Sequence, residues 1–250
     1  MSNEIMKKDT GSVALFGDDL QKGFENMTQE DMALPFVRIL GQLSPQVTDG
    51  DAKYIDGAKP GMIYNTVTSE CFDGKKGIKV IPCYYKKDYP EWSDRGDGPG
   101  APVAVHLPNS PVIQTGKRDG SKIRLPNGNY LEETASYYVL VETKAGGMTP
   151  ALISMKSTQL NVSKKWNSMM KTIQISDGKG GMAIPPMHGV VYNLQSVLQK
   201  NDKGSWYGWS VAQDRIMGQE DKSLYLTAKD FNTSVAKGNV QTKADVEEKA

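Results

Sequence analysis

Residues 78–92 read IKVIPCYYKKDYPEW, and this stretch decides how the chain is expected to fold. Its first half is rich in β-branched and aromatic side chains, which is typical of a β-strand. The glycine turn CFDGKKG precedes it, and GMIYNTVT lies before that turn, so the sequence predicts a β-hairpin over residues 61–85. Pro90 is expected to end the second strand and to leave the neighbouring rings near a loop.

Neighbouring tyrosines in this strand must point to opposite faces, because side chains alternate along a strand. Tyr84 and Tyr85 therefore cannot both enter one core. We expect one of them to be interior and the other to be half-exposed beside Lys86 and Lys87.

Further strands are predicted at ASYYVLVET (135–143), TPALISM (149–155), HGVVYNLQSVLQK (188–200) and SWYGWSVAQDRI (205–216). Between them, residues 157–173 place Val162, Trp166, Met169, Met170 and Ile173 on one face of a helix. Residues 223–238 predict a closing amphipathic helix that Gly238 caps. Antiparallel strands with one helix inserted late indicate a mainly β protein with an OB-like Greek-key barrel, an inserted helix and a C-terminal helix.

The expected domain organisation follows from composition and turn signals. It consists of a flexible acidic arm (1–27), an OB-like β-barrel domain (28–218) with a long loop (94–130), a C-terminal helix (219–240) and a polar tail (241–250).

Charge is distributed unevenly along the chain although the net charge is only +1. Residues 1–52 hold four Lys and Arg against nine Asp and Glu, whereas residues 53–215 hold 21 against 14. A basic centre favours a polyanionic partner, and acidic ends favour segments that repel or mimic such a partner.

Several classes of protein are disfavoured by what the sequence lacks. No apolar run approaches a membrane span, and the N-terminus has no signal-peptide core, so a cytoplasmic protein without a membrane partner is expected. The phosphate-binding, dinucleotide, zinc-deaminase and GxSxG motifs are all missing. We therefore expect no enzyme activity, no catalytic residues and no cofactor.

A metal site is not expected either. Cys71, Cys83, His106 and His188 have none of the short spacings that zinc ligands favour. A second candidate is an acidic cluster that could hold a divalent ion for nuclease chemistry, but its interleaved Lys, Arg and Gly favour a solvated loop. That cluster consists of Asp88, Glu91, Asp94 and Asp97.

Aromatic rings and lysines recur together in YYKKDYPEW (84–92) and SWYGWSV (205–211). Aromatic faces stack on unpaired bases and Lys or Arg neutralise phosphates, so this combination is what single-stranded nucleic acid requires. Rings in a β protein are often core residues, and Trp166 is assigned to the core because it lies on the apolar face of its helix. The predicted DNA-binding residues are Tyr85, Lys86, Lys87, Tyr89, Trp92, Arg118, Lys122, Lys164, Lys165, Trp206 and Trp209.

The segments LPFVRILGQLSPQV, GMIYNTVT, IPCYYKKDYPEW and STQLNVSKKWNSMM…GSWYGW resemble tailed-bacteriophage early proteins that bind single-stranded DNA through an OB-like fold. The resemblance spans roughly residues 25–240. It implies a protein that coats exposed strands during phage replication or recombination in the host bacterial cytoplasm. It also implies replication or recombination proteins as partners, but the C-terminal ADVEEKA lacks the aromatic end of a typical recruiting tail.

Two alternatives remain open at this point. A structural or assembly protein of the virion would use exposed aromatic rings for protein contacts and would form stable oligomers. A strand-annealing factor or a metal-dependent nuclease would act on DNA in the presence of a divalent ion. Oligomeric state is not determined by the sequence, and a homo-oligomer is compatible with each alternative.

Overall fold

The structure is a computed structural model that describes residues 15, 17–19, 22–27, 32–94, 101–202 and 204–240. The chain divides into two compact units, Met1–Met32 and Ala33–Ala250. In the first unit the described residues form one short 3-10 helix, η1 (Gly17–Asp19). The predicted tail (241–250) and most of the predicted arm (1–27) lie outside the described residues.

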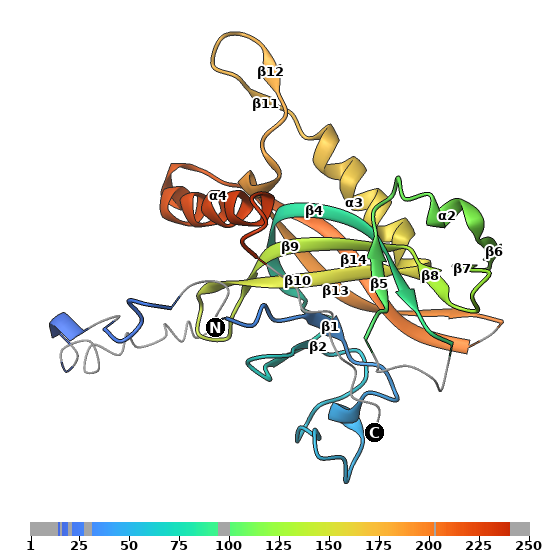
Figure 1. Ribbon diagram of the computed structural model, residues 1–250. Helices are drawn as coiled ribbons and strands as arrows, with labels where there is room; N and C mark the ends of the chain where they lie inside the picture. The colour runs from blue at the N-terminus through green and yellow to red at the C-terminus, as the bar shows by residue number, and fades with distance from the viewer. Residues whose placement is uncertain are drawn as a thin grey trace. The chain divides into compact units, whose positions relative to one another are not determined.

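The second unit contains the strands and the longer helices (Figure 1). Its strands are β1 (Val37–Ile39), β2 (Ile63–Asn65), β3 (Cys71–Phe72), β4 (Ile78–Trp92), β5 (Ala104–His106), β6 (Lys117–Asp119), β7 (Lys122–Arg124), β8 (Tyr130–Glu132), β9 (Thr134–Glu142), β10 (Met148–Lys156), β11 (Ile175–Ser176), β12 (Met182–Ala183), β13 (Val190–Asn201) and β14 (Gly204–Ile216). Its helices are α2 (Val112–Thr115), α3 (Leu160–Thr172) and α4 (Lys222–Ala236), with 3-10 turns η3 (Pro45–Val47), η4 (Ser157–Gln159), η5 (Met187–Gly189) and η6 (Gln219–Asp221).

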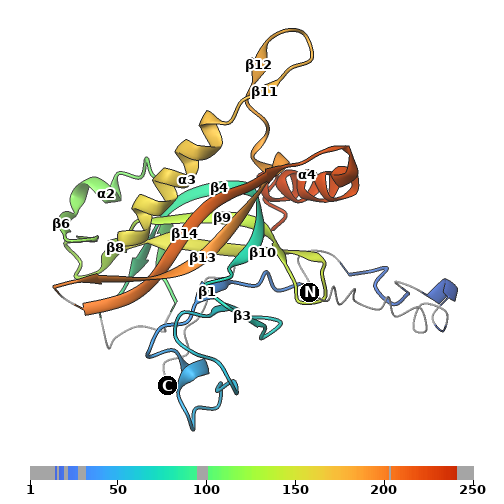
Figure 2. The same ribbon diagram turned by 180° about the vertical axis from the view of Figure 1, so that it is seen from behind.

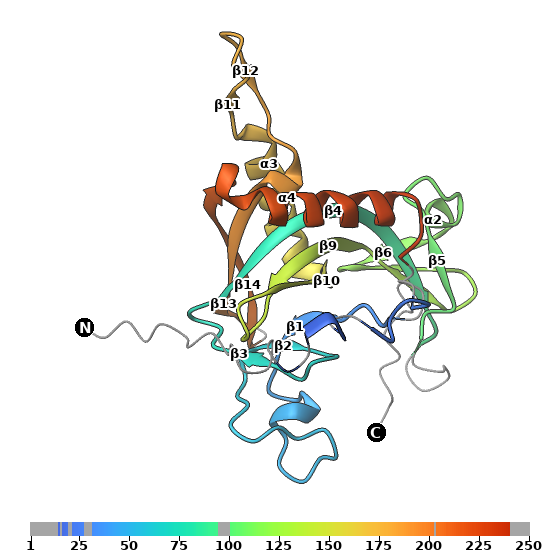
Figure 3. The same cartoon turned by 90° about the vertical axis from the view of Figure 1, so that its left-hand side faces the viewer.

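The main sheet is antiparallel and is built around the long strand β4. The first part of β4 pairs with β13 on one side and with β9 on the other, which gives the order β14–β13–β4–β9–β10. The last part of β4 pairs with β5 and β8, and β8 continues through β7 to β6. The sheet is curled like a half-barrel (Figure 3), and β14 and β10 do not pair with each other in the part of the chain that is described.

Each face of this sheet is covered, so the protein has two apolar layers. On one face, Val80 and Tyr137 pack with Trp166 of α3 and with Val37 and Ile63 of the small β1–β2–β3 sheet. A bridge between Phe36 and Leu152 joins the segment before β1 to β10. The opposite face packs against α4, which lies across the outer side of β4 and β9 (Figure 3).

The double cover corrects the expectation for the tyrosine pair. Tyr84 packs with the α4 layer and Tyr85 packs with the α3 layer, and both are half-buried. Alternation along the strand does separate the two rings, but each side of the sheet offers a core. One interior and one half-exposed ring were expected because that interpretation assumed a sheet with only one buried face, whereas here both rings are half-buried.

The strand also continues through Pro90, contrary to expectation. Pairing with β9 ends at Asp88 and pairing with β8 begins at Glu91, so on that side Pro90 lies at a junction between two partners. A proline lacks only its N–H in a strand, and a missing donor is tolerated where no ladder bond is required.

The segment predicted as a long loop (94–130) contains several short helices and strands in its described part. It forms β5, α2, β6 and β7, followed by β8. Tyr89, Ile123, Leu125 and Leu131 make a small apolar cluster beneath them. Gly, Pro and Asn in this segment mark the tight turns between very short strands, which explains why its composition resembled that of a loop.

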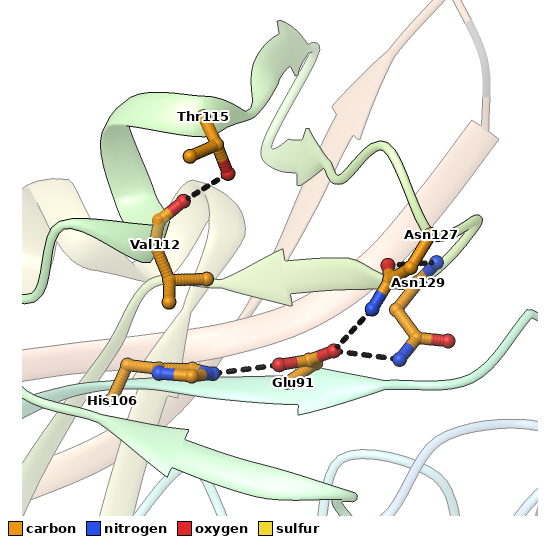
Figure 4. Close-up of polar contacts among 6 residues, drawn as sticks. All are labelled: Glu91, His106, Val112, Thr115, Asn127 and Asn129. Carbon is orange, nitrogen blue, oxygen red and sulfur yellow. Dashed lines mark hydrogen bonds and ion pairs between the residues drawn. The ribbon is translucent and has the colours of Figure 1, made fainter.

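The buried carboxylate of Glu91 holds this layer together (Figure 4). It accepts hydrogen bonds from Asn129 Nδ2 at 2.6 Å and Asn127 Nδ2 at 3.1 Å, and its Oε2 lies 2.7 Å from His106 Nε2. The hydrogen bond from Asn129 is the main cause of a lowered Glu91 pKa. Glu91 therefore stays ionised and ties β4 to β5 and to the β7–β8 turn.

The expectation of a mainly β fold with few helices is confirmed, and its sheet is a curled half-barrel with one helix inserted between hairpins and one helix at the end of the folded region.

Candidate nucleic-acid interface

Helix α3 is fixed to the sheet through its inner face. Trp166 is 0% exposed, stacks on Tyr137 with ring centroids 4.3 Å apart and meets Tyr192 edge-on at 5.5 Å. The Tyr137 hydroxyl lies within hydrogen-bonding distance of Ser163 and Asn167 of the same helix. Burial is the main cause of a raised Tyr137 pKa, so this hydroxyl remains protonated and available as a donor. The prediction that Trp166 is a core residue is confirmed.

The outer face of α3 is basic. Lys164, Lys165 and Lys171 are exposed, and we call these three residues the α3 ridge. The helix contains no acidic residue, and no carboxylate in the described part of the chain pairs with the ridge. Three cations without neutralising partners form a surface that attracts polyanions.

A pocket of about 380 Å³ lies where α3 begins, between η4 and the tip of the β13–β14 hairpin. Trp206 forms its aromatic wall, and small polar groups form the rest. The lining residues are Ser157, Thr158, Asn201, Gly204, Ser205 and Trp206.

The pocket is held in shape by one glutamine. The backbone N–H of Trp209 donates to Gln159 Oε1 at 2.7 Å, and Gln159 Nε2 donates to Gln199 Oε1 at 3.4 Å. These bonds tie η4 to both strands of the hairpin. Ser157, in the pocket lining, has a φ of 52°, an unusual backbone conformation for a residue with a side chain.

Alternation along β14 decides which rings line the pocket. Trp206 is half-buried and faces it, whereas the ring of Tyr207 lies on the opposite side against Gly61. Trp206 Nε1 is buried and has no hydrogen-bond acceptor among the described residues. Trp209 is only 5% exposed and belongs to the core beside Trp166.

The predicted residues of β4 are arranged differently from the α3 ridge. Lys86 pairs with Asp88 at 3.1 Å and Lys87 pairs with Glu133 at 2.6 Å. The hydrogen bond from Lys87 to Glu133 is the main cause of a raised Lys87 pKa. The ring of Tyr85 packs against that of Tyr137 in the core, with ring centroids 5.1 Å apart.

Tyr89 is also buried, in the small cluster beneath the β5–β8 layer. The YYKKDYPEW segment therefore presents neutralised lysines and packed rings rather than an open stacking surface.

The remaining predicted residues lie at the end of β4 and in the short strands. Arg118 is exposed on β6, while Lys122 Nζ lies 3.6 Å from the centre of the Tyr130 ring. Trp92 is half-buried at the end of β4. Of the predicted DNA-binding residues, only Lys164, Lys165 and Trp206 lie on α3 or in the pocket at its start.

The prediction missed the hydroxyl residues of the pocket and Lys171. Ser157 and Thr158 immediately precede the predicted helix, and Lys171 lies off its apolar face, so the helical pattern alone could have found Lys171. The pairing of Ser157 and Thr158 with Trp206 depends on a contact between distant segments, which no local pattern reveals.

The acidic cluster is used for structure. Asp88 pairs with Lys86, Glu91 holds the network of Figure 4, and Asp94 pairs with Arg124, while Asp97 lies outside the described residues. Within the described ranges, no group of three or more His, Cys, Asp or Glu is placed to hold a metal ion. Burial raises the pKa of the Cys83 thiol to about 12, so this thiol does not ionise near neutral pH.

No helix in the described residues has the length and apolar content needed to cross a bilayer.

Fold and surface together define a mainly β protein with a basic helix beside a pocket that contains an aromatic ring. The family model of the Pam3 phage gp34-like proteins matches residues 7–241, and the chain belongs to this family of phage proteins. No curated protein matches the chain. No solved structure matches it either.

Proposed function

We propose that this phage protein binds single-stranded DNA through the α3 ridge and the Trp206 pocket. It would coat exposed strands during phage replication or recombination in the host cytoplasm, without catalysing a reaction. The phage family supports this setting, because replication and recombination expose single strands in the infected cell.

The observation that carries the proposal is the combination of unpaired lysines and an accessible ring on adjoining elements. Lys164 lies four positions after Leu160, the first residue of α3, which is about 6 Å along the helix at 1.5 Å per residue, and the pocket residue Thr158 lies in the 3-10 turn η4 just before α3. A base stacked on Trp206 would therefore leave the neighbouring phosphates within reach of the α3 ridge. The hydroxyls of Ser157, Thr158 and Ser205 suit a sugar or phosphate oxygen.

Single-stranded DNA is favoured over a duplex because the ring lies in a pocket. A stacked base must first leave its own helix, and unpaired strands present bases at no such cost. The polar lining can serve any base, so the proposed binding is independent of sequence.

The first test is titration of labelled oligo-dT at several salt concentrations, with intrinsic tryptophan fluorescence followed in parallel and a duplex as competitor. We expect binding that weakens with salt and is poorly competed by duplex. Trp206→Ala should raise the dissociation constant roughly 5- to 150-fold, equivalent to about 1–3 kcal/mol for one stacked base.

Trp206→Phe is the matched control, because phenylalanine keeps an aromatic face. It should retain most of the affinity while losing the part of the fluorescence change that Trp206 contributes. Equal losses for Ala and Phe in folded proteins would argue against stacking.

Other outcomes would favour the alternatives. Absence of binding at low salt together with stable oligomers would favour a virion structural or assembly protein. Strand cleavage or annealing that requires a divalent ion would favour a nuclease or an annealing factor.

A further inference from the structure

The β11–β12 hairpin extends the polypeptide beyond the end of α3. It follows α3 directly and projects away from the main sheet (Figures 1 and 2). Its two strands pair over only two positions each, Ile175 with Ala183 and Ser176 with Met182. A two-stranded hairpin alone is marginally stable in water and gains stability by packing against something else. A hairpin that projects from the sheet is therefore suited to contact with a partner.

Its turn is organised internally by Asp177. The carboxylate accepts hydrogen bonds from the backbone N–H groups of Lys179 and Gly181, each at 2.8 Å. The N–H of Lys179 is the main cause of a lowered Asp177 pKa. The acidic group is therefore committed to the turn, and glycines at 178 and 180 adopt the positive φ values, 72° and 90°, that the turn requires.

The hairpin exposes apolar side chains on its second strand and just after that strand. Met182 is 62% exposed and Ile184 is 53% exposed. Isolated exposed apolar residues are common, but here two of them lie on a projecting segment that has no core of its own.

The charge around these residues favours a polyanion. Residues 157–189 contain four lysines and one acidic residue, Asp177. Exposed Lys171 lies near the end of α3 and exposed Lys179 lies in the turn, so two cations precede Met182 and Ile184 within 13 residues of the chain. A protein partner with an apolar face has no need of this charge, whereas a nucleic acid offers both phosphates and apolar base faces.

We propose that the β11–β12 hairpin is a second DNA-contacting element, in which Met182 and Ile184 pack against bases and Lys179 contacts a phosphate. This inference rests on the proposed function and extends it along the same strand. Apolar side chains that pack against or between bases are a known mode of DNA contact. Helix α3 is 13 residues long, about 20 Å, so the hairpin would meet bases about six nucleotides from the pocket at a B-form rise.

The test compares oligo-dT of about 5 nucleotides with oligo-dT of about 16 nucleotides, using anisotropy at low salt. The variant is Met182→Ser/Ile184→Ser in the full chain. Leu107→Ser is the matched control, because Leu107 is 56% exposed next to β5, outside both α3 and the hairpin. We expect the hairpin variant to bind the long oligonucleotide at least fivefold more weakly and the short one within twofold of wild type, while the control changes neither.

A second measurement reads the contact directly. Hydroxyl-radical or peroxide oxidation of Met182, followed by mass spectrometry, should slow when the long oligonucleotide is bound and stay unchanged with the short one.

The outcomes separate the two ideas. Unchanged affinity of the variant for the long oligonucleotide, with no protection of Met182, would overturn the hairpin contact and leave the Trp206 site intact. Equal weakening for both lengths would also overturn it, because the substitutions would then act on the fold or the pocket. Failure of the wild-type protein to bind either length would overturn the proposed function and the hairpin contact together.

Discussion

Helices α3 and α4 cover opposite faces of the same curled sheet, and they differ in what they show to solvent. Both bury an apolar face, through Trp166 and Met170 in α3 and through Phe231 and Val235 in α4. The outer face of α3 carries only positive charge, whereas α4 and the turn before it carry both signs.

Packing against the sheet therefore constrains only the inner side of each helix. Either helix could carry mixed charges outside without loss of core contacts, as α4 does. A helix face that carries only positive charge has no opposite charges to pair with, and its lysines repel one another. Folding does not require such a face, so its presence on α3 is better explained by a ligand.

The largest expected effect is the loss of stability when the buried aromatic ring of either helix is removed. Trp166→Ala and Phe231→Ala should each lower the free energy of unfolding by about 3–5 kcal/mol, because each removes a large buried ring. Urea denaturation followed by far-UV circular dichroism would measure both. Leu226→Ala, at an exposed position of α4, serves as the control and should cost much less. A small loss for Trp166→Ala would mean that α3 is not a packed part of the core.

The next prediction concerns the exposed lysines of the two helices and their effect on the salt dependence of DNA binding. Lys164→Ala/Lys165→Ala should weaken oligo-dT binding and reduce the slope of log affinity against log salt by about 1.4, since each phosphate contact in a single strand contributes about 0.7. Lys222→Ala/Lys229→Ala on α4 is the matched double variant and should leave the slope unchanged. Equal changes in the two variants would show that charge acts through the whole molecule and not through the α3 ridge.

A smaller effect is expected from the polar contact that anchors each helix. Tyr137→Phe removes the hydroxyl that meets Ser163 and Asn167 of α3, and Asn232→Ala removes the 2.6 Å hydrogen bond from Asn232 Nδ2 to the Cys83 carbonyl beneath α4. Each should lower the free energy of unfolding by about 0.5–1.5 kcal/mol. Chemical denaturation would measure both, and a negligible loss in either variant would show that apolar packing alone positions that helix.

The smallest expected effect is a pH dependence confined to the α4 side. His188 is buried with its ring 5.2 Å from that of Tyr225, and burial, with a smaller contribution from Lys229, lowers its pKa below the ordinary 6.5. The unfolded chain then takes up the proton first as the pH falls. Stability should therefore be fully present above about pH 6.5 and decline below it until the folded-state pKa is passed.

Urea midpoints measured between about pH 5 and 8 would test this, with His188→Gln as the comparison that should lack this component. If His188→Gln loses as much stability between about pH 8 and pH 5 as the wild type, the pH dependence comes from other groups. Glu91 adds a separate loss at lower pH, since its depressed pKa makes the folded state favour the carboxylate and its contribution disappears only as the pH falls below about 4.5.

Periodicity in the sequence predicted much of the fold because it reports local geometry. The mainly β class and the apolar face of α3 both follow from patterns of two or 3.6 residues, which depend on neighbouring residues alone. Residues 94–130 were misjudged because strands of three residues are too short to show a pattern, and the turn residues between them dominate the composition.

The candidate site was predicted only in part, for a related reason. Alternation placed Trp206 and Trp209 on opposite faces of their strand, as it did Tyr84 and Tyr85, but it does not say which face is buried. Lys86 and Lys164 are alike in sequence, yet one pairs with a carboxylate and the other does not.

Local pattern and composition were enough to predict the mainly β class, the positions of the longer strands and helices, and the basic character of the centre of the chain. Which rings are buried, which lysines are neutralised, and the meeting of Trp206 with Ser157 and Thr158 at the start of α3 became known from the folded arrangement. Those outcomes depend on contacts between residues about 50 positions apart, such as the bond from Trp209 to Gln159, and such contacts exist only once the sheet has curled and both of its faces are covered.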